Sequence, residues 1–498
     1  MTAVRDLLWL ALAIPATGAL LIGLAGHRTT LRESMTFLSA SLLFTVVLIL
    51  ASTVWGPQDG PDALRLVLAE PLPGLAISLS LEPLGLLFAL IASGLWIINS
   101  LYSLAYLRAN DEQHQTRFFV FFALSIASTM GIALAGNFFT LFLFYELLTL
   151  STWPLVTHHS DAAAQRSGRI YLGILMGTSI CLLLPALIAV WMVTGTTEFA
   201  EGGILANKLA PQWAWLLLAM CMFGIGKAAL MPFHAWLPNA MVAPTPVSAL
   251  LHAVAVVKAG VFSVVKLIVL LFGTAFLAQA GASEWLTVIA GFTILAASFI
   301  ALRADNLKRR LAYSTVSQLS YVTMAASLLG PLAITGAVLH IAAHALGKIT
   351  LFFAAGNIYT ATHKTRVSEL RGIGRQMPWT MGAFAIGALS MIGLPPTAGF
   401  VSKWYILSGA VTAGHWIAVG VIILSTLLNA AYFLPVLYDA FFSSPIETSN
   451  AADPSGHTEQ VHGEAPLAMV IAITLTAGAT IAMFFLADWP LSLARTLH

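Results

Sequence analysis

Apolar residues recur along the chain in runs long enough to cross a lipid bilayer, which takes about 20 residues in an α-helix. Polar positions separate these runs and rarely interrupt them. We expect fourteen spans, at 6–25, 34–54, 84–107, 118–135, 138–157, 171–193, 213–241, 244–272, 284–302, 310–328, 331–358, 379–410, 416–443 and 466–488. Prolines break the seventh and the twelfth. The pattern predicts an all-α polytopic membrane protein.

The composition agrees with this pattern. Of the 498 residues, 59% are hydrophobic and only 9% are charged, whereas soluble domains carry about 25% charged residues. The two cysteines, Cys181 and Cys221, lie inside apolar runs and are expected to pack there. The first run, Leu7–Leu24, lacks a clean small-residue cleavage site and is expected to remain as the first helix.

Several function classes find no support in the sequence. It contains no Gly-rich phosphate loop, Cys cluster or catalytic triad pattern. It has no basic patch with interleaved aromatic residues, so nucleic acid is not expected as a partner. We therefore expect no cofactor and no metal, with any redox chemistry carried by a partner protein.

Positive charge is distributed unequally among the predicted loops. Even-numbered loops hold only Arg65 and Lys208. Odd-numbered loops hold fourteen Lys and Arg residues: Arg28, Arg32, Arg108, Arg117, Arg166, Arg169, Arg303, Lys308, Arg309, Arg310, Lys364, Arg366, Arg371 and Arg375. The positive-inside rule then places the odd loops in the cytoplasm and both termini outside.

The two broken spans lie five spans apart, an odd offset that implies repeats of opposite topology. We expect N-terminal helices in 1–110, a first five-helix inverted repeat in 111–272, a second in 273–443, and an acidic loop with a final helix in 444–498. The Pro- and Gly-rich segment 56–81 is expected to form a surface hairpin or loop. The polar segment 443–464 is expected to be a mobile loop.

The stretch from Gly226 to Gly260 contains several residues that are energetically unfavourable inside a membrane. It reads GKAALMPFHAWLPNAMVAPTPVSALLHAVAVVKAG, with Lys227 before a proline break and Lys258 in an apolar helix. A lysine at the bilayer centre costs about 2.5–3.5 kcal/mol, and irregular backbone at membrane depth is tolerated only where it is buried in protein or lines a cavity. This stretch is therefore a candidate functional site.

Glu146, in the middle of the fifth span, is the candidate partner of Lys227. At an effective dielectric near 20, a unit charge pair 4 Å apart is worth about 4 kcal/mol, so moving this carboxylate could control the lysine's charge. Glu146 could instead be protonated and bonded to a neighbouring helix, and Lys227 could extend toward an interface.

Lys258 has no interface within reach of its side chain and is the candidate central proton acceptor and donor. Lys266, eight residues later, fits either a functional role or extension toward the interface. His252 and His234 each fit either a bridging donor or a core histidine.

His340, His344 and Lys348 share one stripe of the eleventh span, at i, i+4 and i+8. A histidine chain suits proton relay because the ordinary pKa of histidine is near neutral. Metal binding, haem ligation and structural packing remain alternatives, although no further ligand stands at metal-ligating spacing. Lys403, after the second break, is the expected counterpart of Lys227.

These motifs together resemble the antiporter-like family, which includes the Mrp-type multisubunit Na+/H+ antiporters and the three large proton-pumping membrane subunits of respiratory complex I. The resemblance covers about residues 84–440. The matching stretches are FYELLTLS, GKAALMPFHAWLPNAM, APTPVSALLHAVAVVKAGVF, LKRRLAYSTVSQLSY, HIAAHALGKITLFFAAG and GLPPTAGFVSKWYIL.

The resemblance implies fourteen spans with two inverted five-helix repeats and broken seventh and twelfth helices. It implies that Glu146 and Lys227 form a switchable ion pair, that Lys258 is the central lysine, and that the His340, His344 and Lys348 stripe leads to Lys403 on the exit side. The chain departs from some relatives in the SQL stretch (317–319) that follows the AYST motif, where they place a histidine, and at Lys403, where one has Glu.

The resemblance favours a proton-translocating protein like the D-type component of Mrp antiporters, in a bacterial inner membrane. Its implied partners are other membrane subunits, with H+ and Na+ as the transported ions. The alternative is a proton-pumping component of a complex I-like or hydrogenase-like redox complex. An organic-solute carrier is disfavoured because the polar groups inside the spans are titratable.

Overall fold

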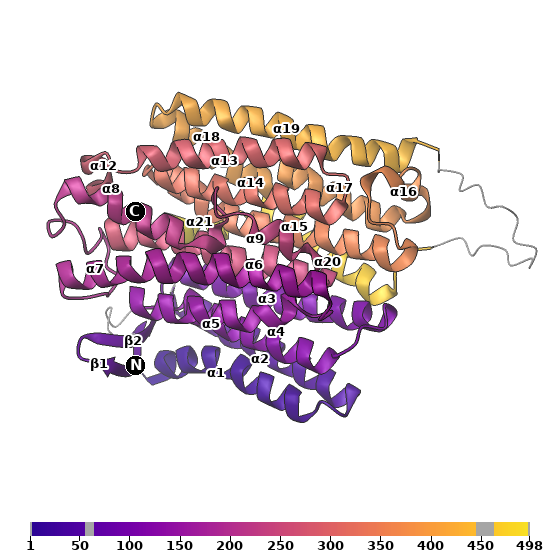
Figure 1. Ribbon diagram of the computed structural model, residues 1–498, viewed down its shortest axis with the longest axis horizontal. Helices are drawn as coiled ribbons and strands as arrows, with labels where there is room; N and C mark the ends of the chain where they lie inside the picture. The colour runs from indigo at the N-terminus through magenta and orange to yellow at the C-terminus, as the bar shows by residue number, and fades with distance from the viewer. Residues whose placement is uncertain (1, 55–63, 445–462, 497–498) are drawn as a thin grey trace, which may run out of the picture.

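The protein is a bundle of roughly parallel and antiparallel helices, seen side-on in Figure 1. The computed structural model describes residues 2–54, 64–444 and 463–496. Most of the predicted mobile loop at 443–464 therefore lies outside the described residues. In Figure 1 the N-terminus, the C-terminus and the one β-hairpin of the described chain lie near the same end of the bundle.

Up to Ala280, the described residues form twelve α-helices and two strands. They are α1 (Thr2–Leu24), α2 (Thr29–Val54), β1 (Arg65–Leu72), β2 (Leu75–Ser80), α3 (Pro83–Ala109), α4 (Gln115–Ala133), α5 (Phe138–Val156), α6 (Ala162–Thr178), α7 (Leu184–Thr194), α8 (Pro211–Gly224), α9 (Trp236–Asn239), α10 (Thr245–Ala249), α11 (Val256–Lys266) and α12 (Thr274–Ala280). Turns of π-helix at Ser179–Leu183, Leu250–Val254 and Leu267–Phe272 join α6 to α7, join α10 to α11 and extend α11.

After α12, the regular structure of the described residues is entirely helical. It comprises α13 (Glu284–Arg303), α14 (Leu307–Ser327), α15 (Pro331–Thr362), α16 (Ile373–Gln376), α17 (Pro378–Ile392), α18 (Ala398–Thr412), α19 (Trp416–Phe442), α20 (Leu467–Phe485) and α21 (Asp488–Arg495). Short 3₁₀ turns occur at Gly226–Ala228, Ala240–Val242 and Val367–Glu369.

Eleven helices within the described residues are long and apolar enough to cross a membrane. The expected fourteen spans are compatible with this finding. The other three correspond to α14, to α8 with α9, and to α17 with α18, which are more polar or are split into shorter pieces. The prediction of an all-α polytopic membrane fold is confirmed, with a two-stranded hairpin added to it.

Two local predictions are refined or corrected. The segment expected as a hairpin or loop contains the antiparallel pair β1–β2, in which Arg65 lies opposite Ser80. Arg166 and Arg169, expected in a loop, lie instead in the first turns of α6. The reason is local, because the Asp161 carboxylate accepts a hydrogen bond from the Ala164 amide at 2.6 Å and so starts this helix nine residues earlier than predicted.

Both predicted helix breaks are present. After α8 ends at Gly224, the chain runs through a 3₁₀ turn and irregular backbone before α9 begins at Trp236. After α17 ends at Ile392, five residues precede α18. Prolines cannot donate a backbone hydrogen bond, so they favour these interruptions. The freed backbone groups become available to other partners.

The two most deeply buried spans form the centre of the bundle. The span Thr245–Phe272, which includes α10 and α11, is buried along its full apolar window, and α15 is almost as fully enclosed. Their candidate residues therefore face protein.

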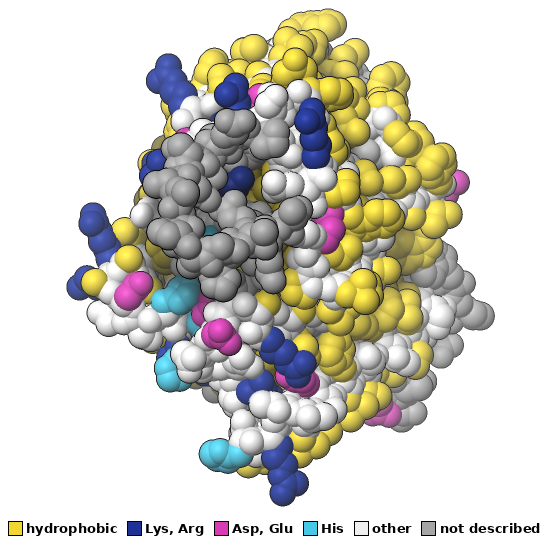
Figure 2. Space-filling view, turned by 90° about the vertical axis from the view of Figure 1, so that its right-hand side faces the viewer, with side chains coloured by type: hydrophobic (Ala, Val, Ile, Leu, Met, Phe, Trp, Pro, Cys, Tyr) yellow, Lys and Arg dark blue, Asp and Glu magenta, His cyan; other side chains and the backbone are white. Residues whose placement is uncertain are grey.

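The end of the bundle seen in Figure 2 carries Lys and Arg side chains at many positions around its surface.

Candidate functional site

Lys227 is held by the face of α5 that carries Tyr145 and Thr149. Its Nζ donates to the Tyr145 carbonyl at 2.7 Å and to the Thr149 hydroxyl at 2.6 Å, and it lies 3.2 Å from the centre of the Tyr145 ring. The side chain is fully buried. A buried ammonium needs such partners because leaving it unpaired costs several kcal/mol.

The backbone of the first break is stabilised by neighbouring side chains. The Lys227 amide donates to the Tyr145 hydroxyl at 3.0 Å, and the Trp236 indole donates to the Gly226 carbonyl at 2.9 Å. Gly260, two residues after Lys258, packs directly on this turn, where a Cβ atom would lie 2.4 Å from the Lys227 carbonyl carbon. Only glycine allows this close approach.

Glu146 follows Tyr145 in α5, but its carboxylate does not directly bond Lys227. Neither carboxylate oxygen has a hydrogen-bond partner among the described residues, and both are inaccessible to solvent. The ion pairs within the described part of the chain include none between these two side chains. The Lys227 ammonium instead uses a carbonyl and a hydroxyl of the same helix.

Lys258 joins the two halves of the chain. Its Nζ is in hydrogen-bond contact with Nδ1 of His344, so α11 meets α15 at this point. Each side chain is only 1% exposed. Either nitrogen can act as the donor, depending on the protonation and tautomer of the pair.

Lys258 and His344 begin a row of buried polar side chains. The row continues through His340 and Ser402 to Lys403, beside the second break. The His344 and His340 rings stack with centroids 6.0 Å apart, one helical turn from each other. Nδ1 of His340 lies 2.9 Å from the Ser402 hydroxyl on α18, next to Lys403. The Tyr321 ring of α14 lies 5.7 Å from the His340 ring and 4.7 Å from the Lys403 Nζ.

Lys403 binds the broken end of α17. Its Nζ donates to the Met391 carbonyl at 2.7 Å and to the Ile392 carbonyl at 3.2 Å. The Asn429 amide also donates to Met391, at 3.2 Å. A cation at the C-terminal end of a helix is favoured by the helix dipole and by the carbonyls of the last turn, which have no partner within the helix.

The remaining candidates lie around this row. Lys348 is fully buried and donates to the Leu311 carbonyl of α14 at 3.1 Å. His252 is also fully buried, and neither of its ring nitrogens has a partner in the described structure. His234 lies at the break, with its ring 6.2 Å from the Tyr313 ring.

The structure adds residues that the sequence analysis did not select. Tyr145, Thr149, Tyr321 and Ser402 all touch a candidate lysine or histidine. For Tyr145, Thr149 and Ser402 the available signal was a polar side chain within an apolar span, close in sequence to a candidate charge. Tyr321 had no such neighbour in the sequence. Gln318 of α14 is fully buried, and neither amide atom has a partner among the described residues.

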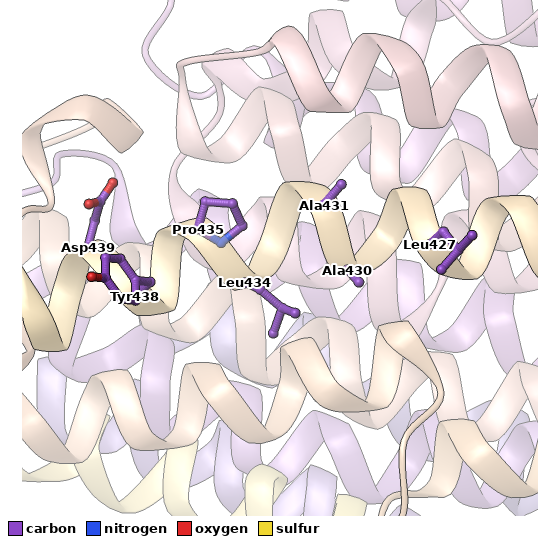
Figure 3. A pocket seen from close by; sticks show the side chains of 7 residues that line it. All are labelled: Leu427, Ala430, Ala431, Leu434, Pro435, Tyr438 and Asp439. Atoms are coloured by element: carbon purple, nitrogen blue, oxygen red, sulfur yellow. The ribbon is translucent and has the colours of Figure 1, made fainter.

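A groove of about 580 Å³ on α19 is separate from this row. Figure 3 shows its lining residues, which all come from one helix: Leu427, Ala430, Ala431, Leu434, Pro435, Tyr438 and Asp439. Leu427 and Tyr438 are 63% and 64% exposed, so the groove belongs to the outer surface of the bundle. It contains none of the candidate lysines or histidines.

Comparison with known proteins gives a consistent result. Residues 135–429 match the family model described as "NADH:quinone oxidoreductase/Mrp antiporter, TM". The N subunit of the NADH-quinone oxidoreductase of Desulforudis audaxviator is 35% identical over 428 residues, covering 80% of this chain and 82% of that protein. The A/B subunit of a probable K(+)/H(+) antiporter of Rhizobium meliloti is 32% identical over 387 residues, covering 75% of this chain but only 37% of its own length.

The fold is similar to that of a chain in the Mrp complex from Dietzia sp. The TM-score is 0.85 with 21% sequence identity, and the match covers 100% of this chain and 97% of that one. The family match includes both helix breaks and every candidate site residue from Glu146 to Lys403. The chain is therefore a multi-pass membrane protein that belongs to the NADH:quinone oxidoreductase/Mrp antiporter family.

Proposed function

We propose that this chain is the proton-translocating subunit of a multisubunit cation/proton antiporter, most similar in role to the D-type component of Mrp antiporters. It acts with other membrane subunits in a bacterial inner membrane, with both termini on the outer side and Na+ as the exchanged cation. The buried Glu, Lys and His side chains carry H+ across the middle of the membrane. Residues 111–272 and 273–443 act as the two inverted repeats.

The contact between Lys258 and His344 is the observation that carries this proposal. It connects the helix that packs on the first break to the helix that leads to the second. Together with His340, Ser402 and Lys403 it makes a continuous buried row. Packing in a hydrophobic interior gives no reason to maintain such a row, whereas intramembrane titratable groups commonly form proton relays.

Proton movement along the row follows from charge repulsion. Its lysines and histidines are basic, so a proton held on one member disfavours a proton on the next. A proton arriving at Lys227 would therefore favour release from Lys258 to His344 and onward to Lys403. Glu146, whose carboxylate has no hydrogen-bond partner among the described residues, is placed to bias the first step if it moves toward Lys227.

The test uses the complete complex in closed membrane vesicles. Lys258→Ala is expected to abolish cation-dependent proton exchange, as read by a pH-sensitive dye, while assembly is unchanged. Lys208→Ala is the matched control, because Lys208 is exposed in a loop, where its ammonium donates to the Thr194 carbonyl. Normal exchange by a fully assembled Lys258→Ala complex would refute the relay.

A redox-driven proton pump is the second candidate. The supporting observation is sequence similarity, because the chain is 35% identical over 428 residues to the N subunit of a quinone oxidoreductase and covers 82% of that relative. The composition of the purified complex separates the two. Co-purification with small antiporter-type membrane proteins supports the first proposal, and co-purification with an iron–sulfur redox arm supports the second.

A further inference from the structure

Lys266 belongs to a second charged site, at the hairpin end of the bundle. Its Nζ lies 2.9 Å from Oε2 of Glu82 and donates to the Ala135 carbonyl at 2.6 Å. It also lies 4.8 Å from the centre of the Phe199 ring. The Lys266 side chain is 0% exposed. Its ammonium is therefore held inside the protein and does not extend to an interface.

Glu82 connects this buried lysine to the surface. It stands between β2 and α3, and its side chain is 23% exposed. The Ser80 hydroxyl donates to its other carboxylate oxygen, Oε1, at 2.8 Å. One carboxylate thus contacts a fully buried cation with one oxygen and the hydroxyl of the partly exposed Ser80 with the other. We call Ser80, Glu82 and Lys266 the hairpin port.

A second ion pair lies beside the hairpin port. Arg65 of β1 lies opposite Ser80 in the strand register and pairs with Glu198 at 2.5 Å. Asn137, at the start of α5, donates to the same Glu198 oxygen at 3.1 Å. Glu198 precedes Phe199, whose ring faces Lys266. Arg65 and Glu198 are each about one-third exposed, so this second pair is more accessible to solvent than Lys266.

The hairpin port lies on the same continuous span as Lys258. Eight residues separate the two lysines, which corresponds to a rise of about 12 Å along a helix. This is far longer than a hydrogen bond, so water or intervening side chains must carry a proton between them. The buried hydroxyl of Ser263 lies between the two positions in the chain.

We propose that the hairpin port is a proton exchange point between the first repeat and the aqueous phase on the hairpin side. This inference rests on the proposed proton relay through Lys258. In the exchange step the Lys266 ammonium gives one proton to the Glu82 carboxylate. That step leaves a neutral amine and a neutral carboxylic acid, and Glu82 then releases the proton to water. The reverse sequence admits a proton.

The experiment measures proton flux by the complete complex in oriented proteoliposomes while the pH on the hairpin side is varied. Glu82→Gln keeps the size of the side chain but cannot ionise, and it is expected to lower the flux about tenfold or more. Glu82→Asp is expected to retain most of the flux. Arg65→Gln is the control, since it breaks the neighbouring ion pair without touching Lys266, and its flux should stay within about twofold of wild type.

Ser80→Ala provides a milder variant in case Glu82→Gln does not assemble. It removes a hydrogen bond to the carboxylate and is expected to move the flux–pH profile on the hairpin side to higher pH, because the charged form loses a partner. A structural role alone would leave that profile in place. An unchanged profile in assembled Ser80→Ala, or wild-type flux in assembled Glu82→Gln, overturns the inference.

Lys258→Ala, measured in parallel, separates this inference from the proposed function. Loss of flux in Lys258→Ala with normal behaviour of both port variants refutes the port and leaves the relay standing. Normal flux in assembled Lys258→Ala refutes the relay and the port inference with it.

Discussion

The Lys258 Nζ and the His344 Nδ1 are in direct contact, although 86 residues separate them in the chain. The contact joins α11 to α15, the two most enclosed parts of the bundle. Both side chains are buried, and among the described residues these two nitrogens have no other hydrogen-bond partner. A change in the charge of one side chain therefore changes the electrostatic energy of the other.

His344→Gln tests this relationship directly. Glutamine can still bond Lys258 but cannot take up and pass on a proton, so flux should decrease about 100-fold while the melting temperature stays near wild type. Proton flux and thermal unfolding are measured on the same purified complex. His363→Gln, at an exposed site after α15, is the control and should conduct normally. Equal flux in the two variants would show that His344 is not in the path.

Thr149→Val tests the site that holds Lys227. Valine has nearly the same shape as threonine but removes the hydroxyl that accepts from the buried ammonium at 2.6 Å. The free energy of unfolding should decrease by about 1.5–3 kcal/mol, the range for hydrogen bonds to charged groups.

The unfolding measurement is made in detergent–lipid micelles. Thr45→Val is the control, because Thr45 is exposed on α2 and its hydroxyl donates to the Ser41 carbonyl of its own helix. Its effect should stay within about 0.5 kcal/mol. A Thr149→Val loss as small as that would contradict the assigned contact.

Lys403→Met should loosen the second helix break. It removes the ammonium that bonds the Met391 and Ile392 carbonyls but keeps an apolar side chain of similar length. The amides of Gly393 and Leu394, which both donate to the Leu389 carbonyl, should exchange hydrogen about tenfold faster. Trp404→Leu, at an adjacent site that is 58% exposed, should leave these rates unchanged. Wild-type exchange in Lys403→Met would mean that the lysine does not stabilise the break.

His158, in the turn after α5, should make stability depend on pH. Burial, reinforced by the Arg117 charge, lowers the pKa of His158 to about 4, whereas an unfolded chain titrates near 6.5. Between these values the unfolded state binds more protons. The stability linked to His158 is therefore fully present above about pH 6.5 and is lost as the pH falls toward 4.

Melting temperatures between pH 4 and 7 check this expectation. His158→Gln cannot titrate, so it should flatten the decrease in melting temperature toward low pH. His159→Gln, at the more exposed neighbouring position, should retain the wild-type slope. If both variants retain it, the acid sensitivity arises elsewhere.

The positions of the helix breaks and of the buried charges could be predicted from local pattern. Proline removes a backbone donor wherever it stands, so the interruptions around Lys227 and before Lys403 are visible in the sequence. The spacing of His340, His344 and Lys348 likewise places them on one side of any helix. Helix ends were less predictable, as α6 shows, because one Asp161 cap extended it into a polar segment.

The contacts of those charges depended on tertiary packing. The sequence suggested Glu146 as the partner of Lys227, but in the folded chain the ammonium meets the carbonyl and hydroxyl of Tyr145 and Thr149 instead. Nothing in the sequence indicated that Glu82 would pair with Lys266 across 184 positions. Hydrogen bonds extend only about 3 Å, so small shifts in helix register decide which partner is chosen.

The sequence by itself determined the membrane class, the broken spans and the set of titratable groups, because hydropathy and proline chemistry act locally along the chain. Only the tertiary structure decided that Lys258 meets His344, that Lys403 holds the end of α17, and that Lys266 is bound beneath the hairpin. Those choices depend on how helices distant in sequence pack together, and on the requirement that each buried charge find a partner at hydrogen-bond distance.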